Sequence, residues 1–429
     1  MIYWIVCLLV IIFTFTPFAH ATNGMNIIGF GPLGLGIGGA DVALLGACSP
    51  IASNPANLIQ VCDRSLSIGS SFLYPRLRLK TDPSPGQKGN NRASSHQVFA
   101  FPFTSMAVKL NDRLGIGVGV FVQGGMGVNF KDLNTIFDTR DEIKSQVRFG
   151  RLSPTIVYSP TERLSVGLSV KLGYADVGYK FFPATSLYRD EMVFFGQELR
   201  GARSTTFSIT TGVNYKLTQR IRLGIDVTTK SSLDLKAGKL LVNMEGLGLG
   251  MVRYDAEVKD FTWPAQLRMG LSVRPASKIK LAFELRHIWW KEALGTIRVK
   301  GRDPHGGGTT RPPDFKAKFP FRWRNQWVAA FGGEIQATPN ILIRFGYNHG
   351  DNPIRSRYLS PLFPATVEDH VSLGVRFACP CVKGTAIDLA YVHAFTTEEK
   401  VEAPSLIAGE DLRIKHVQDT LGLFFTKKF

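Results

Sequence analysis

Two pairs of cysteines have the residue type and spacing that could carry chemistry in this sequence. Cys48 and Cys62 lie near the N-terminus, and Cys379 and Cys381 are separated by a single proline near the C-terminus. An even number of cysteines in an oxidising compartment is typical of disulfides, and a bond between Cys48 and Cys62 would close one loop. Cross-pairing between the two sites is the alternative. Neither pair has the usual spacing of zinc ligands, so we expect no metal ion.

A glycine-rich stretch near the N-terminus has the spacing of a dinucleotide-binding loop. Gly34, Gly36 and Gly39 fit the pattern G-x-G-x-x-G, which holds a pyrophosphate only between a strand and a helix. Residues 22–62 are rich in Gly, Ala, Pro and Asn and show no strand alternation, so we expect no cofactor. The sequence also lacks Gly-x-Ser-x-Gly, His-Glu-x-x-His and P-loop motifs, and its eight histidines are dispersed. We therefore expect a protein that is not an enzyme.

The elements that must position these residues are strands. From Ser65 onward apolar and polar residues alternate with period two, as in Leu164, Val166 and Leu168 with Ser165 and Gly167 between them. A soluble β-sandwich would also alternate. The predicted strands are, however, much longer than the roughly five or six residues that are usual in soluble proteins.

Fourteen strands are predicted, and short turns alternate with longer loops between them. Turns such as 111–113 and 218–219 are short, whereas loops such as 131–145 and 182–202 at the other end are long. This even-stranded antiparallel pattern is typical of a transmembrane β-barrel of an outer membrane. The predicted strands are 65–79, 94–110, 114–130, 146–159, 163–181, 203–217, 220–236, 258–274, 278–299, 321–337, 340–350, 367–378, 384–398 and 413–429.

Aromatic residues support the same interpretation. A bilayer supplies no water to unpaired backbone groups, so only helices or closed barrels span it. The last strand is apolar on one face and ends on Phe429, which resembles the signal that outer-membrane proteins present to the barrel assembly machinery. Several aromatic residues near predicted strand ends would form girdles at the membrane surfaces. These residues are Trp289, Trp290, Trp323, Trp327, Tyr347 and Tyr391.

The N-terminus and the net charge indicate the compartment. Residues 2–19 are continuously apolar and precede Ala19-His20-Ala21, which predicts a cleaved signal peptide over residues 1–21 that takes Cys7 with it. An uncleaved membrane anchor is the alternative. The formal net charge is +17, but the cations are scattered singly, so we expect no nucleic-acid partner. Cations on loops could instead bind the phosphates of lipopolysaccharide.

Two sequence motifs resemble the FadL/TodX family of outer-membrane transporters of long-chain fatty acids and aromatic hydrocarbons. Residues 34–41 and 53–58 are similar to the family's N-terminal hatch, with Asn54, Pro55 and Ala56 as its Asn-Pro-Ala element. Residues 344–354 look like its late-barrel motif. The likeness covers nearly the whole chain after residue 21.

The resemblance implies a fourteen-stranded barrel over residues 65–429, closed from inside by a hatch over residues 22–64. It also implies that substrate leaves sideways through an opening made by a kink in the third strand. The matching strand here contains Gly124, Gly125 and Gly127, and glycine inside a strand permits a bulge. The alternative is that these glycines only relieve crowding on the lumen face.

A carboxylate head group would need an inward cation in an apolar pocket. Strand parity suggests Arg322 and Arg324, which lie opposite Phe321 and Trp323, and it suggests Lys180 if a bulge at 174–176 shifts the register. Solvated charges on a lumen wall are the alternative.

The sequence thus predicts a monomeric outer-membrane channel for passive transport of hydrophobic small molecules, in contact with outer-membrane lipid and lipopolysaccharide. A surface-interaction barrel with a permanently closed plug is one alternative, and a general porin is another.

Overall fold

The structure is a computed structural model that describes residues 23–44, 51–60, 64–95, 98–189, 192–308, 310–401, 407, 409 and 411–429. The predicted signal peptide (residues 1–21) and two of the predicted disulfide cysteines, Cys48 and Cys62, lie outside these residues.

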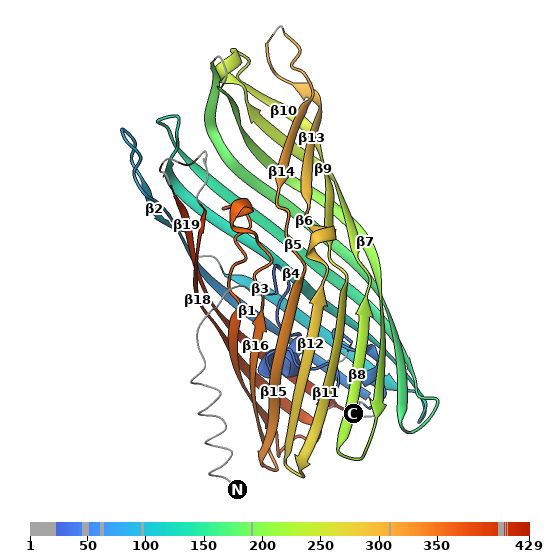
Figure 1. The fold of residues 1–429 in the computed structure, drawn as a ribbon. Coiled ribbons are helices and arrows are strands. Elements are labelled where there is room, and N and C mark those ends of the chain that lie inside the picture. The colour runs from blue at the N-terminus through green and yellow to red at the C-terminus, as the bar shows by residue number, and fades with distance from the viewer. Residues whose placement is uncertain are drawn as a thin grey trace.

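The described strands form one closed antiparallel sheet, and, once interrupted segments are joined, each strand of the wall pairs with the next one along the chain (Figure 1). The last strand pairs with the first, from Ser65 opposite Lys428 to Thr81 opposite Leu412, and this pairing closes the barrel. The strands are β1 (Arg64–Thr81), β2 (Asn90–Ala93), β3 (Phe99–Lys109), β4 (Leu114–Asn134), β5 (Arg140–Tyr158), β6 (Leu164–Arg189), β7 (Met192–Lys216), β8 (Ile221–Thr228), β9 (Ser231–Asn243), β10 (Met251–Trp263), β11 (Gln266–Ala276), β12 (Ile279–Ile288), β13 (Thr296–His305), β14 (Phe315–Pro320), β15 (Gln326–Thr338), β16 (Ile341–Gly350), β17 (Asp369–Ala378), β18 (Thr385–Val401) and β19 (Leu412–Lys428).

Five strands of the barrel wall are interrupted along their length. Within the described residues there are nineteen strand segments, and β2–β3, β8–β9, β10–β11, β12–β13 and β14–β15 each belong to one wall strand, which leaves fourteen. The predicted fourteen-stranded antiparallel barrel is therefore confirmed. Turns at one end, such as residues 110–113, are short, while the segment between β16 and β17 at the other end spans residues 351–368.

Several strands run further than the sequence pattern predicts, because the polarity of their two faces reverses along their length. In the lower part of β6, Leu168 and Leu172 point outward and are exposed, as expected for side chains that face a lipid bilayer. In the upper part of the same strand, Ala175, Val177 and Tyr179 point inward and are buried. The wall therefore extends beyond the lipid-facing belt as a tube that is polar outside and apolar inside.

This reversal corrects two predicted loops. The predicted loop 131–145 contains only a short turn between Asn134 and Arg140, and most of the predicted loop 182–202 belongs to β6 and β7. Charged residues of the upper wall face outward and pair across neighbouring strands, as Arg148 and Asp176 do at 2.7 Å and Lys239 and Asp255 do at 2.5 Å. Part of the net positive charge thus lies on the outer surface of the upper wall.

The helices of the described residues are short. They are α2 (Gly31–Gly36), α3 (Trp290–Ala293) and the 3-10 turns η1 (Pro55–Gln60), η2 (Glu245–Leu247) and η3 (Ser356–Tyr358). None of the helices in the described ranges is long and apolar enough to cross a membrane.

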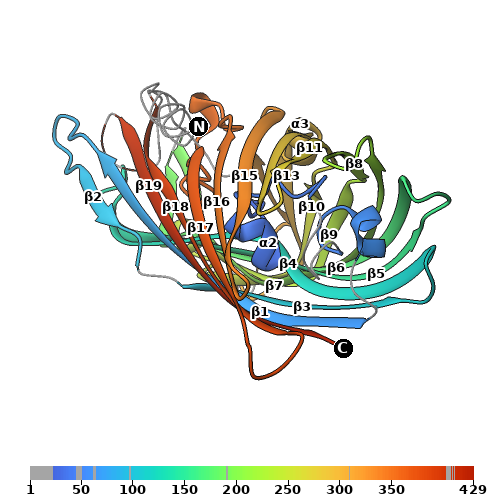
Figure 2. The same ribbon diagram turned by 90° about the horizontal axis from the view of Figure 1, so that it is seen from below.

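Residues 23–44 and 51–60, which we call the hatch segment, lie inside the lower barrel (Figure 2). Their backbone approaches the wall closely because glycines face it. A side chain at these wall positions would overlap the hatch segment or, at Gly374, press tightly against it, so the glycines together form its seat. The seat consists of Gly117, Gly119, Gly124, Gly167, Gly212, Gly224, Gly270, Gly332, Gly346, Gly374 and Gly422.

The seat predicts that one methyl group on the wall displaces the hatch segment. In Gly346→Ala the new Cβ would overlap the backbone of Ile37 and Gly38, and relieving such overpacking costs about 1–3 kcal/mol. We expect the barrel to assemble, as checked by its heat-modifiable gel mobility, but the hatch segment to be cleaved faster by protease in isolated outer membranes. Gly295→Ala, at a position with no atom nearby, is the control. Equal cleavage of the two variants would contradict a steric seat.

Candidate functional site

A buried charge cluster holds the hatch segment to one side of the wall. The guanidinium of Arg268 on β11 binds Asp226 on β8 and lies 3.1 Å from the carboxylate of Asp41 in the hatch segment. Glu284 on β12 accepts a hydrogen bond from the backbone N–H of Val42 at 3.0 Å and pairs with Arg286 at 2.8 Å. Because the cluster joins hatch and wall in a region without solvent, breaking it leaves buried charge uncompensated.

Asp41 remains a good partner for this cluster at neutral pH. Burial raises the pKa of Asp41 to about 6, while the Arg268 guanidinium acts in the opposite direction. Its side chain also accepts a hydrogen bond from the hydroxyl of Ser53, which ties the two described parts of the hatch segment together. A second cluster of the same kind lies beneath α2, where Arg344 binds Glu334 at 3.0 Å and Asp388.

The predicted hatch residues Asn54, Pro55 and Ala56 lie at the contact between the hatch segment and β7. The amide nitrogen of Asn54 donates to the carbonyl oxygens of Val42 at 2.9 Å and Val213 at 3.0 Å, and its oxygen accepts from the N–H of Ala56 at 3.0 Å. Pro55 is the first residue of η1. The motif therefore cross-links the hatch segment to itself and to the wall.

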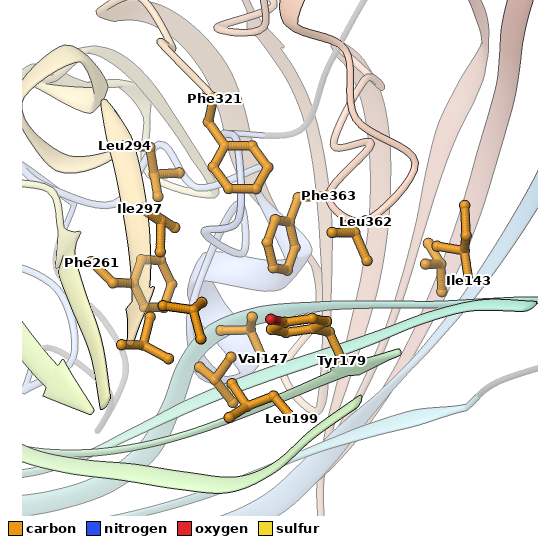
Figure 3. Close-up of a cluster of buried hydrophobic side chains, with 14 of the residues drawn as sticks. Ile143, Val147, Tyr179, Leu199, Phe261, Leu294, Ile297, Phe321, Leu362 and Phe363 are labelled. Atoms are coloured by element: carbon orange, nitrogen blue, oxygen red, sulfur yellow. The ribbon is translucent and has the colours of Figure 1, made fainter. Parts of the chain in front are cut away.

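Above the hatch segment the lumen is filled by apolar side chains from opposite walls and from the loop between β16 and β17. Figure 3 shows Val147 and Tyr179 from β5 and β6 pointing toward Leu362 and Phe363 of that loop. The ring of Phe363 packs at 5.1 Å from that of Phe321. An interior of this kind favours hydrophobic molecules over polar solutes, which a general porin would pass.

The same loop carries an acid that is kept neutral. Burial raises the pKa of Glu368 to about 10, and repulsion from Asp369, Asp351 and Glu399 adds to the effect. Its carboxyl oxygen accepts from the backbone N–H of Asn352, so the group helps to fold the loop into the lumen without adding a charge at neutral pH.

Three tryptophans line the lumen at the level where the wall strands are interrupted. Trp263, Trp290 and Trp323 are buried and pack ring to ring, at 6.2 and 4.9 Å between centroids. The girdle prediction is therefore wrong for Trp290 and Trp323, whereas Trp327, Tyr347 and Tyr391 are exposed on the outer surface. The indole N–H of Trp263 donates to the side-chain oxygen of Asn26 at 2.8 Å, which fixes the start of the hatch segment.

A cavity of about 300 Å³ lies between the start of the hatch segment and the upper part of β4. Its lining is mostly apolar and includes Met25, Ile28, Phe99, Met126 and Phe149. The size is at the lower end of the range for ligand pockets, and the lining suits a small hydrophobic molecule.

The wall beside this cavity is not continuously paired. Among the described residues, β3 and β4 pair only as far as Phe103 opposite Phe121, and further up the contact resumes where Ser95 donates to Asn129 at 2.8 Å. Between these points the pairing of β4 with β5 shifts by one residue, so that Gln123 is an extra residue in β4. Below this bulge Phe121 points inward, and above it Val128 does.

The predicted kink glycines lie at this bulge. Gly124 forms a bridge with Asn26 of the hatch segment, and the N–H of Gly125 donates to the carbonyl of Met25 at 3.1 Å. A side chain at Gly124 would overlap Met25, and one at Gly125 would overlap the backbone of β5. Gly127 also lines the cavity.

The predicted head-group cations do not point into the lumen. Lys180 faces outward and pairs with Glu142 at 2.6 Å, because β6 keeps a continuous register with β5 and has no bulge at 174–176. Arg322 and Arg324 are exposed, while Phe321 and Trp323 are the buried residues. The predicted inward direction of Arg322 and Arg324 is wrong, because it assumes that the apolar face of the strand points outward. At this level of the wall the apolar face points inward.

Two inward-pointing cations were not among the predicted site residues. Arg151 and Lys171 are buried on β5 and β6, and Arg151 donates to Ser231 at 3.1 Å and stacks over the Phe149 ring. Both belong to the polar face of the lower, lipid-facing strand segments, so the alternation itself contained the signal. They are not part of the cavity lining.

The C-terminal cysteines show no disulfide in the described part of the chain. Cys379 and Cys381 lie in the turn between β17 and β18 and have no disulfide partner among the described residues. A bond to Cys48 or Cys62 falls outside the described residues and stays a prediction.

The charge cluster predicts that Arg268 is required to retain the hatch segment. Arg268→Met keeps the length of the side chain but leaves Asp226 and Asp41 without their cation, which we expect to cost about 3–5 kcal/mol. Amide hydrogen exchange of residues 37–44 in the folded barrel should accelerate strongly. Arg274→Met, which removes an exposed guanidinium from the same strand, should leave exchange unchanged. Slow exchange in Arg268→Met would show that the cluster does not hold the hatch segment.

Comparisons with known proteins place the chain in a family. Residues 23–421 match the family described as outer membrane protein transport protein (OMPP1/FadL/TodX). Among solved structures, a Pseudomonas aeruginosa FadL homologue superposes with a TM-score of 0.78 at 16% identity, covering 95% of this chain and 100% of the other. The Ralstonia pickettii toluene transporter TbuX gives 0.75 at 18% identity, with 94% and 99% covered. The Pseudomonas putida toluene transporter TodX gives 0.76 at 20% identity, with 95% and 100% covered.

No curated protein matches the sequence. The structural likenesses support the fold, and the family match over most of the sequence decides the assignment: the chain belongs to the OMPP1/FadL/TodX family of outer membrane transport proteins.

Proposed function

We propose that the chain takes up hydrophobic small molecules passively and releases them sideways into the membrane between β3 and β4. The observation that carries this proposal is the cavity of about 300 Å³, whose lining includes Phe99 and Ala100 of β3 and Gly124 and Met126 of β4, the two strands that separate there.

The lateral route follows the apolar surface of the protein. Downward, the cavity meets the hatch segment, whose Ile28 and Leu35 line it and which the ion pair of Asp41 with Arg268 holds to the wall. Sideways, it meets a wall whose outward residues, such as Val118 and Val120 of β4, are apolar and exposed. Avoiding water preserves about 25 cal/mol for each Å² of apolar surface that stays covered.

The hatch segment contacts β4 at the proposed opening. Met25 and Asn26 bind β4 at Gly124 and Gly125, and the side-chain amide of Gln123 donates to Asn26 at 3.0 Å. These contacts occupy β4 where it would otherwise pair with β3. Movement of residues 23–26 would therefore change the width of the opening.

The substrate class is drawn from the relatives and from the lining. TbuX and TodX are described as toluene transporters, and the aromatic and aliphatic lining of this cavity suits aromatic hydrocarbons or the alkyl part of a fatty acid. We extend the proposal to a monomeric barrel in the outer membrane, inserted by the barrel assembly machinery. The outward Leu421, Leu423 and Phe425 of β19 provide an apolar face to lipid, and Phe429 is the exposed C-terminal residue.

Deleting Gln123 tests the lateral route. The deletion removes the extra residue of β4, so the strand can keep one parity along β5 and continue its pairing with β3. We expect uptake of labelled toluene and oleate to fall at least about tenfold in an outer-membrane host that lacks its own hydrophobe transporter.

Gln123→Ala is the matched control, because it removes the hydrogen bond to Asn26 but keeps the bulge. Assembly of each variant is checked by heat-modifiable mobility. Undiminished uptake by an assembled deletion variant would overturn the lateral route. Absence of uptake by the unmodified chain would overturn transport of these two substrates.

A further inference from the structure

We propose that His370 and His416 form a subsite for the hydroxyl group of a hydrophobic phenol or alcohol. The inference rests on the proposed function and specifies its substrate class. A hydrocarbon has no group that these imidazoles could bind. The proposal therefore adds a site for a polar substituent to one wall of an otherwise apolar cavity.

The two histidines come together through the order of the last strands. His370 lies on β17 and His416 on β19, and both point inward and line the cavity. Between them on β18 lies the buried Ala394, which pairs with His370 and precedes a register shift toward Thr397 opposite His416. Ala394 carries only a methyl group, so its side chain takes up little space on the strand between the two histidines.

Both imidazoles are buried without the hydrogen bonds that buried polar groups require. His370 and His416 are each 1% exposed, and none of their four ring nitrogens has a hydrogen-bond partner of normal geometry among the described residues. A buried polar atom left unsatisfied costs about 1–3 kcal/mol. A ligand that supplies the missing partner from the cavity would recover this free energy.

The surroundings of the rings decide which kind of partner fits. An imidazolium here would be a buried charge with no ion pair in the described part of the chain, so each ring is neutral and offers one N–H donor and one acceptor nitrogen. Backbone carbonyl groups of Glu368 and Asn348 lie beside His370, and that of Pro364 lies beside His416. Since carbonyl oxygens can only accept, they direct the N–H of each ring toward the backbone and leave an acceptor nitrogen for the ligand.

An acceptor nitrogen in an apolar cavity selects an O–H donor. Other polar groups of the same lining include Ser71, Gln418 and Thr420, which can bind the hydroxyl oxygen. Among the described lining residues, Arg148 is the one arginine or lysine, and its guanidinium pairs with Asp176 at 2.7 Å on the outer surface. A carboxylate would therefore lack a cation here, and a pure hydrocarbon would leave the imidazoles unsatisfied.

The experiment compares two ligands of the same shape. Para-cresol and para-xylene differ by a hydroxyl in place of a methyl group, and their binding to the full-length barrel in lipid vesicles is measured with labelled ligand, corrected for partitioning into protein-free vesicles. We expect para-cresol to bind about tenfold more tightly, as one well-formed hydrogen bond provides. In the double variant His370→Leu/His416→Leu the preference should disappear while para-xylene still binds.

His287→Leu is the matched control, because His287 lies on the outer surface against Trp327. It should keep the preference for para-cresol. Binding of para-xylene by the double variant, together with its heat-modifiable mobility, shows that the barrel has folded.

The outcomes separate this inference from the proposed function. Equal affinity of the unmodified chain for the two ligands, or an unchanged preference in the double variant, would overturn the hydroxyl subsite while leaving hydrocarbon transport in place. Tighter binding of para-toluate than of para-cresol would also overturn it, in favour of a carboxylate site. Binding of neither ligand, with no uptake of toluene or oleate, would overturn the proposed function itself.

Discussion

The structure depends on the need to fill the inside of a wide closed barrel. Fourteen wall strands enclose more space than the side chains of the wall can occupy, and larger barrels either leave an aqueous channel or contain a plug. Here the lower lumen holds the hatch segment and the upper lumen holds apolar side chains and the loop over residues 351–368. The hatch segment requires glycines and charged residues on the inner face of the lower wall. The apolar contents of the upper lumen require hydrophobic side chains on the inner face of the upper wall. The cavity lies where the hatch segment and these apolar contents meet.

The bulge at Gln123 is a local consequence of this division. Below the bulge the odd-numbered residues of β4, such as Phe121, point into the barrel. Above it even-numbered residues, such as Val128, point inward. An extra residue in one strand must be absorbed by its neighbours, and here β3 separates from β4 while the hatch segment takes up the vacant backbone positions through Met25 and Asn26. Packing inside the barrel and the discontinuity of its wall are thus one structural feature, which explains why the hatch segment and the opening adjoin.

The charged residues also differ between the lower and the upper barrel. Arg268 and Arg344 are buried but paired, and Arg268 attaches the hatch segment to the wall through Asp41. The many cations of the upper wall pair across strands on the outer surface, where solvent reduces the contribution of each pair. A chain with a net charge of +17 can therefore enclose an apolar upper lumen, because the cations of the upper wall face outward and Arg268 and Arg344 have buried carboxylate partners.

The sequence by itself determined the antiparallel barrel and its strand number, since alternation and turn spacing are local properties of the chain. The N-terminal motif was identified only through its resemblance to a family. The inward or outward direction of individual residues was decided by the tertiary structure. Period-two alternation identifies two faces but not which one is inside, and the apolar face changes from outside to inside along β6. This is why the predicted inward direction of Arg322 and Arg324 is wrong. Lys180 faces outward because the predicted bulge at 174–176 is absent. His370 and His416 line the same cavity because of a register shift in β18 and the small side chain of Ala394. The sequence does not reveal this arrangement, because β17, β18 and β19 must first be paired in the barrel.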